Sequence, residues 1–191
     1  ACRSGGGNGP KYGRAMIVWI NGTFGVGKTT TAKALLERAG WRLFDPEHVG
    51  FLLAGNLRDH DFDDFQDLPP WRELVPAAAD GIYRFADPEA MVAVQTILVA
   101  DYWEELVEGF TDRGLPVFHV VLHCNDDELR RRITSDEVES QALEWRLDHI
   151  AKFRRSRPCN FSGIGVNHAI TVFFSKVKPA TRMFQRPLKI T

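Results

Sequence analysis

A glycine-rich loop between an apolar run and an amphipathic run most constrains the fold of this chain. Residues 22–29 read GTFGVGKT, which fits the phosphate-binding pattern G-x-x-x-x-G-K-[ST]. The preceding AMIVWI is short, β-branched and aromatic, which predicts a buried strand. The residues that follow are apolar at helical spacing up to a helix stop at Gly40. A strand, this loop and a helix in that order are the context that the pattern requires.

The residue types of the loop suit a polyphosphate. Its three glycines permit backbone conformations closed to other residues and let N–H groups converge on phosphate oxygens. The helix directs its positive end at the same anion, Lys28 can reach the β- and γ-phosphates, and the Thr29 hydroxyl can ligate Mg²⁺. The alternative is a glycine-rich turn that happens to carry a lysine. We expect a bound nucleotide, Thr29 as the metal ligand, and these nucleotide-binding residues: Gly22, Thr23, Phe24, Gly25, Val26, Gly27, Lys28, Thr29 and Thr30.

Short apolar runs alternate with amphipathic runs along the rest of the chain. This order predicts an α/β fold of three layers, in which a parallel five-stranded sheet is covered by helices on both faces. Pro76 should break or kink its helix, and Asn125 with Glu128 resembles a capping box. The strands predicted after the first are 41–45, 91–94, 116–124 and 169–174. The helices predicted after the first are 46–57, 71–86, 97–113, 126–133 and 141–153, with a loop at 58–70.

Composition argues against several classes of protein. With 44% hydrophobic and 26% charged residues, the 191-residue chain has the make-up of a soluble globular protein that needs no disulfides. A net charge of −1 gives no general attraction to nucleic acid, so we expect no nucleic-acid partner. The longest apolar run, MVAVQTILVA, is far shorter than the ~20 residues of a transmembrane segment. Three scattered cysteines and no signal peptide predict a cytoplasmic protein.

Residues 17–50, IVWINGTFGVGKTTTAKALLERAGWRLFDPEHVG, are similar to the start of the tunicamycin-resistance protein family. That family belongs to the small P-loop kinases, with chloramphenicol phosphotransferase, shikimate kinase, gluconate kinase and the nucleoside monophosphate kinases. More particular than the loop are FDPEHVG and the junction LHCNDDELRRRI at 122–133. The resemblance covers residues 16–155. It implies a P-loop NTPase fold with a small helical lid, and either ATP- and Mg²⁺-dependent phosphoryl transfer to a small molecule or ATP-coupled binding of one.

The resemblance also suggests how the chain is divided. Residues 1–14 are glycine-rich and aperiodic, which predicts a flexible tail. Residues 15–175 would form the P-loop kinase-like domain, with a lid around 130–157, and either a monomer or a homodimer is compatible with it. The C-terminal tail, 176–191, departs from the family, which closes with a helix. The loop after the last strand helps to hold adenine in related kinases, and here that stretch is basic and contains two prolines.

Candidate acceptor-side residues follow the predicted strands. Asp45 closes the second strand, and in the related kinases an aspartate at this place orients the acceptor hydroxyl or acts as its base. The alternative is an N-cap for the helix at Pro46, and both roles are compatible. Thr96 lies where related kinases line the acceptor pocket, with a helix N-cap as the alternative. Asp101 fits either a metal-associated strand end or the first turn of a helix, and the helix is favoured.

Arginines in the predicted lid are candidates for the transferred phosphate. Arg130, Arg131 and Arg132 follow one another on a helix, so at ~100° per residue they cannot share a face. By the resemblance, we expect Arg131 to bind the nucleotide and Arg132 and Arg146 to act in catalysis beside Lys28 and Asp45. Guanidinium groups suit phosphate better than lysine does. The alternative for such a run is a solvated helix face.

Three other patterns have two interpretations each. His119 and His123 lie on one face of a strand, but Cys124 points the other way, so core histidines are favoured over a metal site. The acidic DHDFDDFQD lacks the glycine and glutamate of an EF-hand and is interpreted as a mobile substrate-side loop. Aromatic residues in the next helix could line an apolar acceptor pocket or serve as core: Trp71, Tyr83 and Phe85.

Two functions therefore remain open from the sequence. The first is an ATP-dependent phosphotransferase that acts on a hydroxyl of a small molecule, which by family likeness is tunicamycin or another nucleoside- or sugar-like antibiotic. The second is an ATP-dependent protein that binds and sequesters such an antibiotic without modifying it. A nucleotide switch acting through partners is disfavoured, because the sequence has no convincing Walker B aspartate.

Overall fold

A computed structural model describes residues 16–135, 143–155 and 170–174. The predicted tails, 1–14 and 176–191, and part of the predicted lid lie outside the described residues. The sheet has five strands in the order β2-β3-β1-β4-β5. These are β1 (Ile17–Asn21), β2 (Arg42–Phe44), β3 (Met91–Val94), β4 (Val117–Leu122) and β5 (Ile170–Phe174).

The α/β fold is confirmed, with one correction to the sheet. β1 to β4 are parallel, but β5 runs antiparallel to β4 and pairs Leu122 with Ile170. The prediction of five parallel strands was therefore wrong for β5. An edge position permits this direction, because an edge strand has only one neighbour to satisfy and mixed sheets with one antiparallel edge are common.

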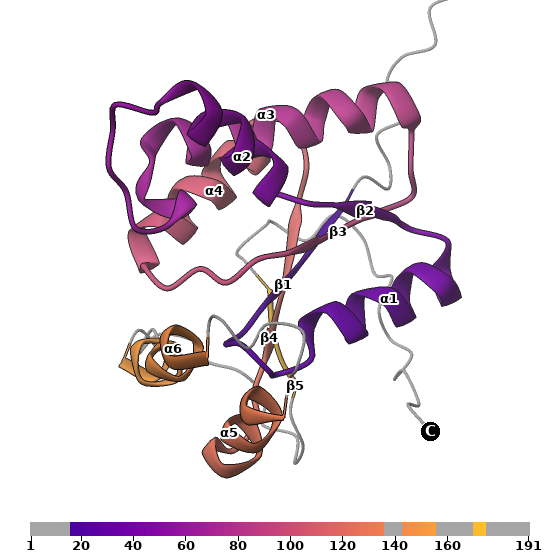
Figure 1. The fold of residues 1–191 in the computed structure, drawn as a ribbon. Coiled ribbons are helices and arrows are strands. Elements are labelled where there is room, and N and C mark those ends of the chain that lie inside the picture. Colours follow the sequence, from indigo (N-terminus) through magenta and orange to yellow (C-terminus); the bar gives the residue numbers. More distant parts are fainter. Residues whose placement is uncertain (1–15, 136–142, 156–169, 175–191) are drawn as a thin grey trace, which may run out of the picture.

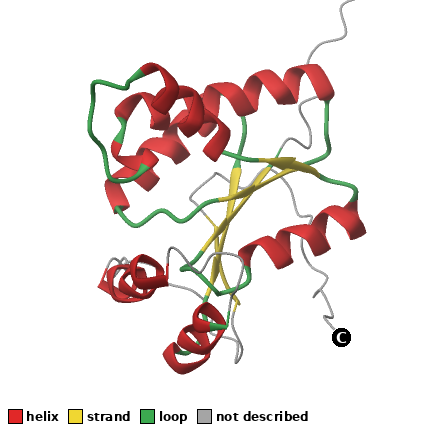
Figure 2. Cartoon of the chain, in the orientation of Figure 1, coloured by secondary structure: helices red, strands yellow, loops and turns green. Residues whose placement is uncertain are grey.

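Helices cover both faces of the sheet (Figures 1 and 2). One face carries α1 (Lys28–Ala39), α5 (Asp126–Thr134) and α6 (Leu143–Arg155). The other carries α2 (Glu47–Asn56), α3 (Pro69–Ala86) and α4 (Ala100–Asp112), with the short 3₁₀ helix η1 (Phe65–Asp67) before α3. The predicted three-layer architecture is confirmed.

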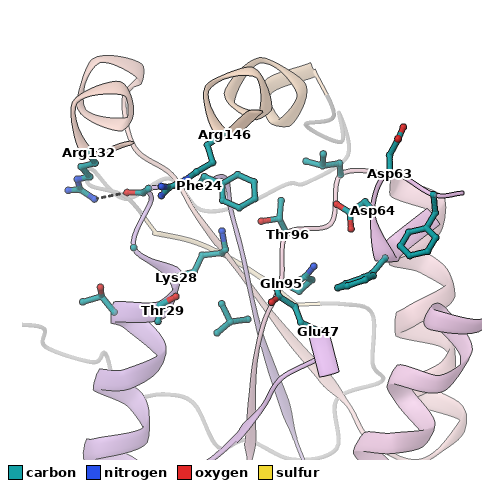
Figure 3. A pocket seen from close by; sticks show the side chains of 17 residues that line it. Phe24, Lys28, Thr29, Glu47, Asp63, Asp64, Gln95, Thr96, Arg132 and Arg146 are labelled. Carbon is teal, nitrogen blue, oxygen red and sulfur yellow. Dashed lines mark hydrogen bonds between the residues drawn. The ribbon is translucent and has the colours of Figure 1, made fainter. Parts of the chain in front are cut away.

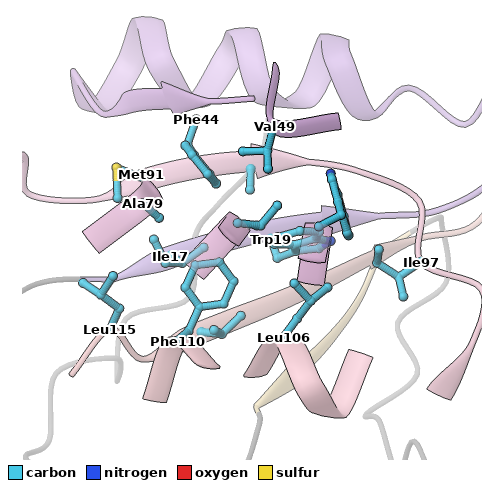
Figure 4. Close-up of a cluster of buried hydrophobic side chains, with 14 of the residues drawn as sticks. Ile17, Trp19, Phe44, Val49, Ala79, Met91, Ile97, Leu106, Phe110 and Leu115 are labelled. Carbon is cyan, nitrogen blue, oxygen red and sulfur yellow. The ribbon is translucent and has the colours of Figure 1, made fainter. Parts of the chain in front are cut away.

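The central strand β1 separates two hydrophobic cores. Its side chains alternate, as the period of a strand requires: Ile17 and Trp19 enter the core under α2, α3 and α4, whereas Val18 and Ile20 enter the core under α1, α5 and α6. Figure 4 shows the first core, in which Trp19 packs edge-on against Phe110 with ring centroids 6.0 Å apart. Because β1 is buried on both faces, the loop that follows it starts from a fixed point.

Two helices differ from their predictions. α3 continues through Pro76, whose ring packs against α4 where Gly109 allows the helices to approach: a Cβ built at Gly109 would lie 2.9 Å from the proline Cγ. The predicted break was therefore wrong, and the alternative, a kink at Pro76, stays a prediction. α4 begins at Ala100 rather than after Thr96, because backbone groups of residues 97 and 98 bond to side chains of other segments. Asp101 lies in the first turn of α4, as the favoured interpretation required.

The predicted loop at 58–70 also contains some regular structure. η1 begins after Asp64, whose side chain accepts from Gln66 N. The Asp67 Oδ2 accepts from Asp64 N, which completes a capping box. No described helix is both long enough and apolar enough to span a bilayer.

Candidate functional site

The loop between β1 and α1 has the conformation that its glycines predict. Gly22, Gly25 and Gly27 have φ angles of 146°, 73° and 102°. At Gly22 a Cβ would also lie 2.9 Å from the carbonyl oxygen of Leu122. A side chain at that position would therefore be strained by the backbone and would clash with β4. α1 begins at Lys28 without a side-chain cap, so its first N–H groups remain for an anion.

The loop lies at one end of a cleft of 810 Å³ (Figure 3). This volume is within the range of pockets that enclose small-molecule ligands. The cleft opens beyond the carboxyl ends of β1 and β3, where parallel α/β sheets place ligands. Its lining residues are Phe24, Gly25, Gly27, Lys28, Thr29, Thr30, Glu47, Phe62, Asp63, Asp64, Phe65, Val94, Gln95, Thr96, Leu98, Arg132 and Arg146.

We call the lining residues 24–30 with Arg132 and Arg146 the phosphate side of the cleft. Of the predicted nucleotide-binding residues, Thr23 and Val26 are buried and their side chains do not line it. These two residues can offer a ligand only their backbone groups. Thr29 and Thr30 line the phosphate side at the first turn of α1.

Lys28 lies within the loop that it would serve. Its Nζ donates to the carbonyl oxygens of Gly22, at 2.8 Å, and Thr23, at 3.1 Å. The same Nζ lies 5.1 Å from the centre of the Phe24 ring, and the Arg146 guanidinium carbon lies 6.0 Å from it. Phe24 thus contacts two cations, which brings Lys28 and Arg146 to the same part of the cleft.

Two of the three predicted catalytic or nucleotide-binding arginines reach the cleft. Arg132 donates from Nη1 to the carbonyl oxygen of Gly25, at 3.3 Å, and Arg146 is buried in the wall. Arg131 does not line the cleft: its side chain is 67% exposed, and both of its bonds go to the carboxylate of Glu128.

Glu128 fixes the direction of both neighbouring arginines. Its oxygens accept from Arg131 and, at 2.7 Å, from Arg132 Nε. The guanidinium of Arg131, followed by that of Arg132, lowers the pKa of Glu128 to about 2. The same carboxylate raises the pKa of Arg131. Glu128 therefore remains an anion at neutral pH and holds Arg132 beside the loop.

The floor of the cleft comes from the irregular connection after β3, through Gln95, Thr96 and Leu98. Asn21 Oδ1 accepts from the N–H groups of Gly22, at 2.7 Å, and Ile97, at 3.1 Å. The Thr96 hydroxyl donates to the carbonyl oxygen of Gly22, at 2.8 Å. Thr96 lines the cleft as expected, although it does not cap α4. These bonds join the floor to the start of the phosphate-binding loop.

Asp45 does not line the cleft. Its Oδ1 accepts from Glu47 N, at 2.9 Å, and its Oδ2 lies 4.0 Å from His48 Nδ1. Asp45 thus bonds to the first residue of α2, but the N-cap of that helix is Pro46, so the capping role that the sequence offered as an alternative is not confirmed. The carboxylate that reaches the cleft from this part of the chain is Glu47, which sequence reasoning missed.

We call Glu47 and residues 62–65 the acceptor side of the cleft. Phe62 and Phe65 have ring centroids 6.0 Å apart, and Asp63 and Asp64 lie between them in sequence. The sequence predicts that the acidic segment lies on the substrate side, but it identifies no particular residue in it. The sequence signal that could have identified Asp64 is its pairing with Asp67, three residues later, in a capping box. Trp71 and Tyr83 lie in the core and Phe85 is exposed, so these three do not line the cleft.

The two histidines of the β4 region have different surroundings. His119 is 2% exposed and stacks on Trp103 at 3.9 Å between ring centroids, and this burial lowers its pKa to about 3. His123 instead lies 6.3 Å from the Phe153 ring. His119 is thus a core histidine, as favoured. Within the described ranges, no group of three His, Cys, Asp or Glu side chains could hold a metal ion.

The donors on the phosphate side fit Mg²⁺ and a nucleoside triphosphate. Uncapped helix amides and three cations suit a polyphosphate, and the Thr29 hydroxyl in the first helical turn suits a hard cation that also binds phosphate oxygens. The structure therefore gives the loop the groups that its sequence pattern predicts.

Comparisons with known proteins identify the family of the chain. The family model described as an AAA domain matches residues 17–157. The tunicamycin resistance protein of Deinococcus radiodurans is 32% identical, and the match covers 80% of this chain and 89% of that chain with a TM-score of 0.56. A sugar kinase of Janibacter sp. HTCC2649 is 20% identical over 70% of this chain and 76% of its own, with a TM-score of 0.52, which shows the fold alone. The sequence matches no curated protein.

Proposed function

Since the chain belongs to the AAA domain family and is similar to the tunicamycin resistance protein of Deinococcus radiodurans, we propose that it is an ATP-dependent phosphotransferase acting on a hydroxyl of a small molecule. One observation carries this proposal: a phosphate-binding loop with three cations and a wall of carboxylates and aromatic rings face the same cleft. A nucleotide on the first side and an alcohol on the second would have their reacting groups in one enclosed space.

The proposed reaction requires few covalent roles from the protein. The acceptor oxygen forms a bond to the γ-phosphorus, the bond from that phosphorus to the β,γ-bridging oxygen breaks, and ADP leaves with the electron pair. The acceptor proton passes to a carboxylate. Lys28, Arg132 and Arg146 stabilise the charge that spreads over the transferred group. Mg²⁺, held through Thr29, would neutralise charge on the phosphate oxygens.

The acceptor side favours a particular charge of acceptor. Glu47, Asp63 and Asp64 line it, and the cations among the described lining residues all belong to the phosphate side. A carboxylate or phosphate group on the acceptor would be repelled there. The rings of Phe62 and Phe65 suit an apolar portion. This supports a neutral or cationic hydroxyl compound, and we propose tunicamycin or another nucleoside- or sugar-like antibiotic, with resistance as the result.

Asp45 can act on the acceptor only after its side chain changes position. As base or anchor for the acceptor, its carboxylate would have to release the Glu47 amide and turn into the cleft. In its present position it accepts from the N–H of Glu47, the first residue of α2, whose side chain lines the cleft. A cytoplasmic location and a monomeric or homodimeric state complete the proposal.

Because Asp45 lies outside the cleft lining, we also propose a second function, which is sequestration of the antibiotic without phosphoryl transfer. If no carboxylate accepts the proton, the chain would bind ATP and the antibiotic without transfer, and resistance would come from sequestration. Incubation with Mg·ATP and tunicamycin, followed by mass spectrometry of the drug, separates the two. We expect a mass increase of one phosphoryl group together with ADP. Unmodified drug that co-purifies with the protein would indicate sequestration, and unmodified, unbound drug would overturn both.

A further inference from the structure

We propose that Asp64 is the carboxylate that binds the acceptor hydroxyl and takes its proton, and that Gln66 is the residue that positions it. The inference rests on the proposed function and adds residues to it that differ from Asp45. It starts from a buried side chain outside the cleft. Gln66 is 3% exposed and does not line the cleft, yet it bonds to three residues that do: Asp64, Thr96 and Leu98.

The amide of Gln66 has one possible orientation. Its Oε1 accepts from Leu98 N, at 3.1 Å, whereas its Nε2 donates to Asp64 Oδ2, at 3.0 Å, and to the carbonyl oxygen of Thr96, at 3.4 Å. A flipped amide would direct an oxygen at two oxygens and an NH₂ group at an N–H. The hydrogen bonds therefore fix which end of the amide faces Asp64.

Gln66 is itself held from behind. Arg72 is buried, and its Nη1 donates to the carbonyl oxygen of Gln66, at 2.6 Å. Arg72 Nε bonds to Glu105 at 2.7 Å, and the guanidinium lies 4.0 Å from the centre of the Tyr102 ring. Because α3 and α4 together hold this arginine, the position of Gln66 is set by the packed helices and not by the surface segment before it.

Asp64 differs from the other two acidic residues of the acceptor side. It is half-buried, whereas Glu47 and Asp63 are exposed. Its Oδ1 accepts from Gln66 N and its Oδ2 from Gln66 Nε2, and the side chain also accepts from the Asp67 backbone in the capping box. Since a carboxylate has about four lone-pair sites, it retains room for an acceptor hydroxyl. In Figure 3, Thr96 stands between Lys28 and Asp64, and the Asp63 side chain points away. Asp64 is thus an oriented hydrogen-bond acceptor across the cleft from the phosphate side.

The step assigned to Asp64 is a proton transfer within the proposed reaction. The acceptor hydroxyl donates to the carboxylate, which holds its oxygen toward the γ-phosphorus. As the new P–O bond forms and the bond to ADP breaks, the O–H bond breaks and the proton moves to Asp64. A positioned base of this kind contributes ~10²–10⁴-fold to the rate.

The first test replaces Asp64 by its isostere. With Mg·[γ-³²P]ATP and tunicamycin, we expect Asp64→Asn to lower kcat for transfer at least ~100-fold. The Kd for Mg·AMPPNP should remain within about twofold of wild type, because the loop is untouched. Asp61→Asn makes the same change at an exposed residue outside the cleft lining and should retain wild-type kcat. Asp64→Asn with wild-type kcat would overturn the inference.

The second test separates positioning from stability. Gln66→Glu would direct a carboxylate oxygen at Asp64 and the Thr96 carbonyl, so the free energy of unfolding and the transfer rate should both fall. In the double variant Asp64→Asn/Gln66→Glu, the Asn amide can donate to the new carboxylate, so stability should recover while transfer does not. Recovery of transfer along with stability would show that Gln66 and Asp64 are structural only.

A binding measurement keeps this inference separate from the proposed function. If wild type binds tunicamycin with Mg·AMPPNP without transferring phosphate to it, Asp64→Asn should weaken that binding at least ~10-fold, as loss of a charged hydrogen-bond partner does. A wild type that neither binds nor modifies the drug would mean that the proposed function has failed. An active wild type with an equally active Asp64→Asn would mean that the assignment of Asp64 alone has failed.

Discussion

The phosphate side and the acceptor side of the cleft are built in different ways. The phosphate side consists of backbone groups and cations on the sheet face that α1, α5 and α6 cover. The acceptor side consists of carboxylates and aromatic rings from α2 and the segment before α3, on the opposite face. The sheet ends between them, and the connection after β3 forms a floor common to both.

This difference separates general chemistry from specificity. The phosphate side depends on glycine conformations and on Asn21, which fixes the loop to the sheet, so it suits any nucleoside triphosphate. The acceptor side depends on side chains that bond across long stretches of sequence, such as Gln66 to Leu98 and Arg72 to Glu105. Substitutions on the acceptor side can therefore change the acceptor without changing how phosphate is held.

The strongest test of this separation is Lys28→Ala. Loss of the loop ammonium should lower phosphoryl transfer by roughly 10³-fold, since it removes a cation that stabilises developing charge. Tunicamycin affinity, measured by calorimetry, should be unchanged if the two sides are independent. Lys33→Ala, an exposed lysine on α1, is the matched control and should retain the wild-type rate. Retained turnover in Lys28→Ala would contradict the role of Lys28.

Arg132 and Arg131 offer a comparison between neighbours on one helix. Arg132→Ala should lower kcat by roughly 10²-fold, because its guanidinium lines the phosphate side. Arg131→Ala should change kcat by less than about threefold, because Arg131 faces away and bonds only to Glu128 among the contacts described above. Steady-state assays at saturating tunicamycin measure both. Equal losses would instead place Arg131 at the nucleotide, as its sequence position first indicated.

The two sides also differ in how well the sequence predicts them. Residues 22–29 are contiguous, and a local pattern contains both their conformation and their chemistry, so the loop, its flanking strand and α1 were predicted correctly. Gln66 gives no such signal, because it is a single polar residue in a segment that reads as a loop. Its burial depends on Arg72, Thr96 and Leu98, and the last two lie 30 and 32 residues away.

Two features of the helices have a non-local cause. The late start of α4 depends on bonds from residues 97 and 98 to Asn21 and Gln66, which helical periodicity cannot reveal. The close packing of Pro76 on α4 depends on Gly109 of that other helix, and the sequence around Pro76 does not indicate this contact. The direction of β5 was equally invisible, because apolar strands read alike in either direction.

A third test uses pH to probe the core on the acceptor-side face. His119 has a pKa of about 3 when folded and an ordinary value near 6.5 when unfolded. The unfolded chain therefore binds a proton between these values that the folded chain does not, so stability falls as the pH falls below 6.5. The loss should reach roughly 2 kcal/mol between pH 7.5 and pH 5.

His119→Phe isolates this contribution, because the ring can still stack on Trp103. Urea unfolding at both pH values measures the change. The variant should lose about 2 kcal/mol less than wild type between pH 7.5 and pH 5. If the two proteins lose the same amount, the pKa of His119 does not differ between the folded and the unfolded state, and the predicted shift is wrong.

The mildest test compares two glycines of α2. Gly50 packs directly against the ring of Phe65, which lines the acceptor side, whereas nothing lies within 4 Å of a Cβ built at Gly55. Gly50→Ala should displace that ring, cost about 1.5 kcal/mol of stability and weaken tunicamycin binding while ATP affinity is retained. Gly55→Ala should stabilise the protein by about 0.5 kcal/mol and leave both affinities unchanged, because alanine is the better helix former. Thermal unfolding and calorimetry measure these effects, and a Gly50→Ala variant that loses ATP affinity as much as drug affinity would show that the two sides are coupled through α2.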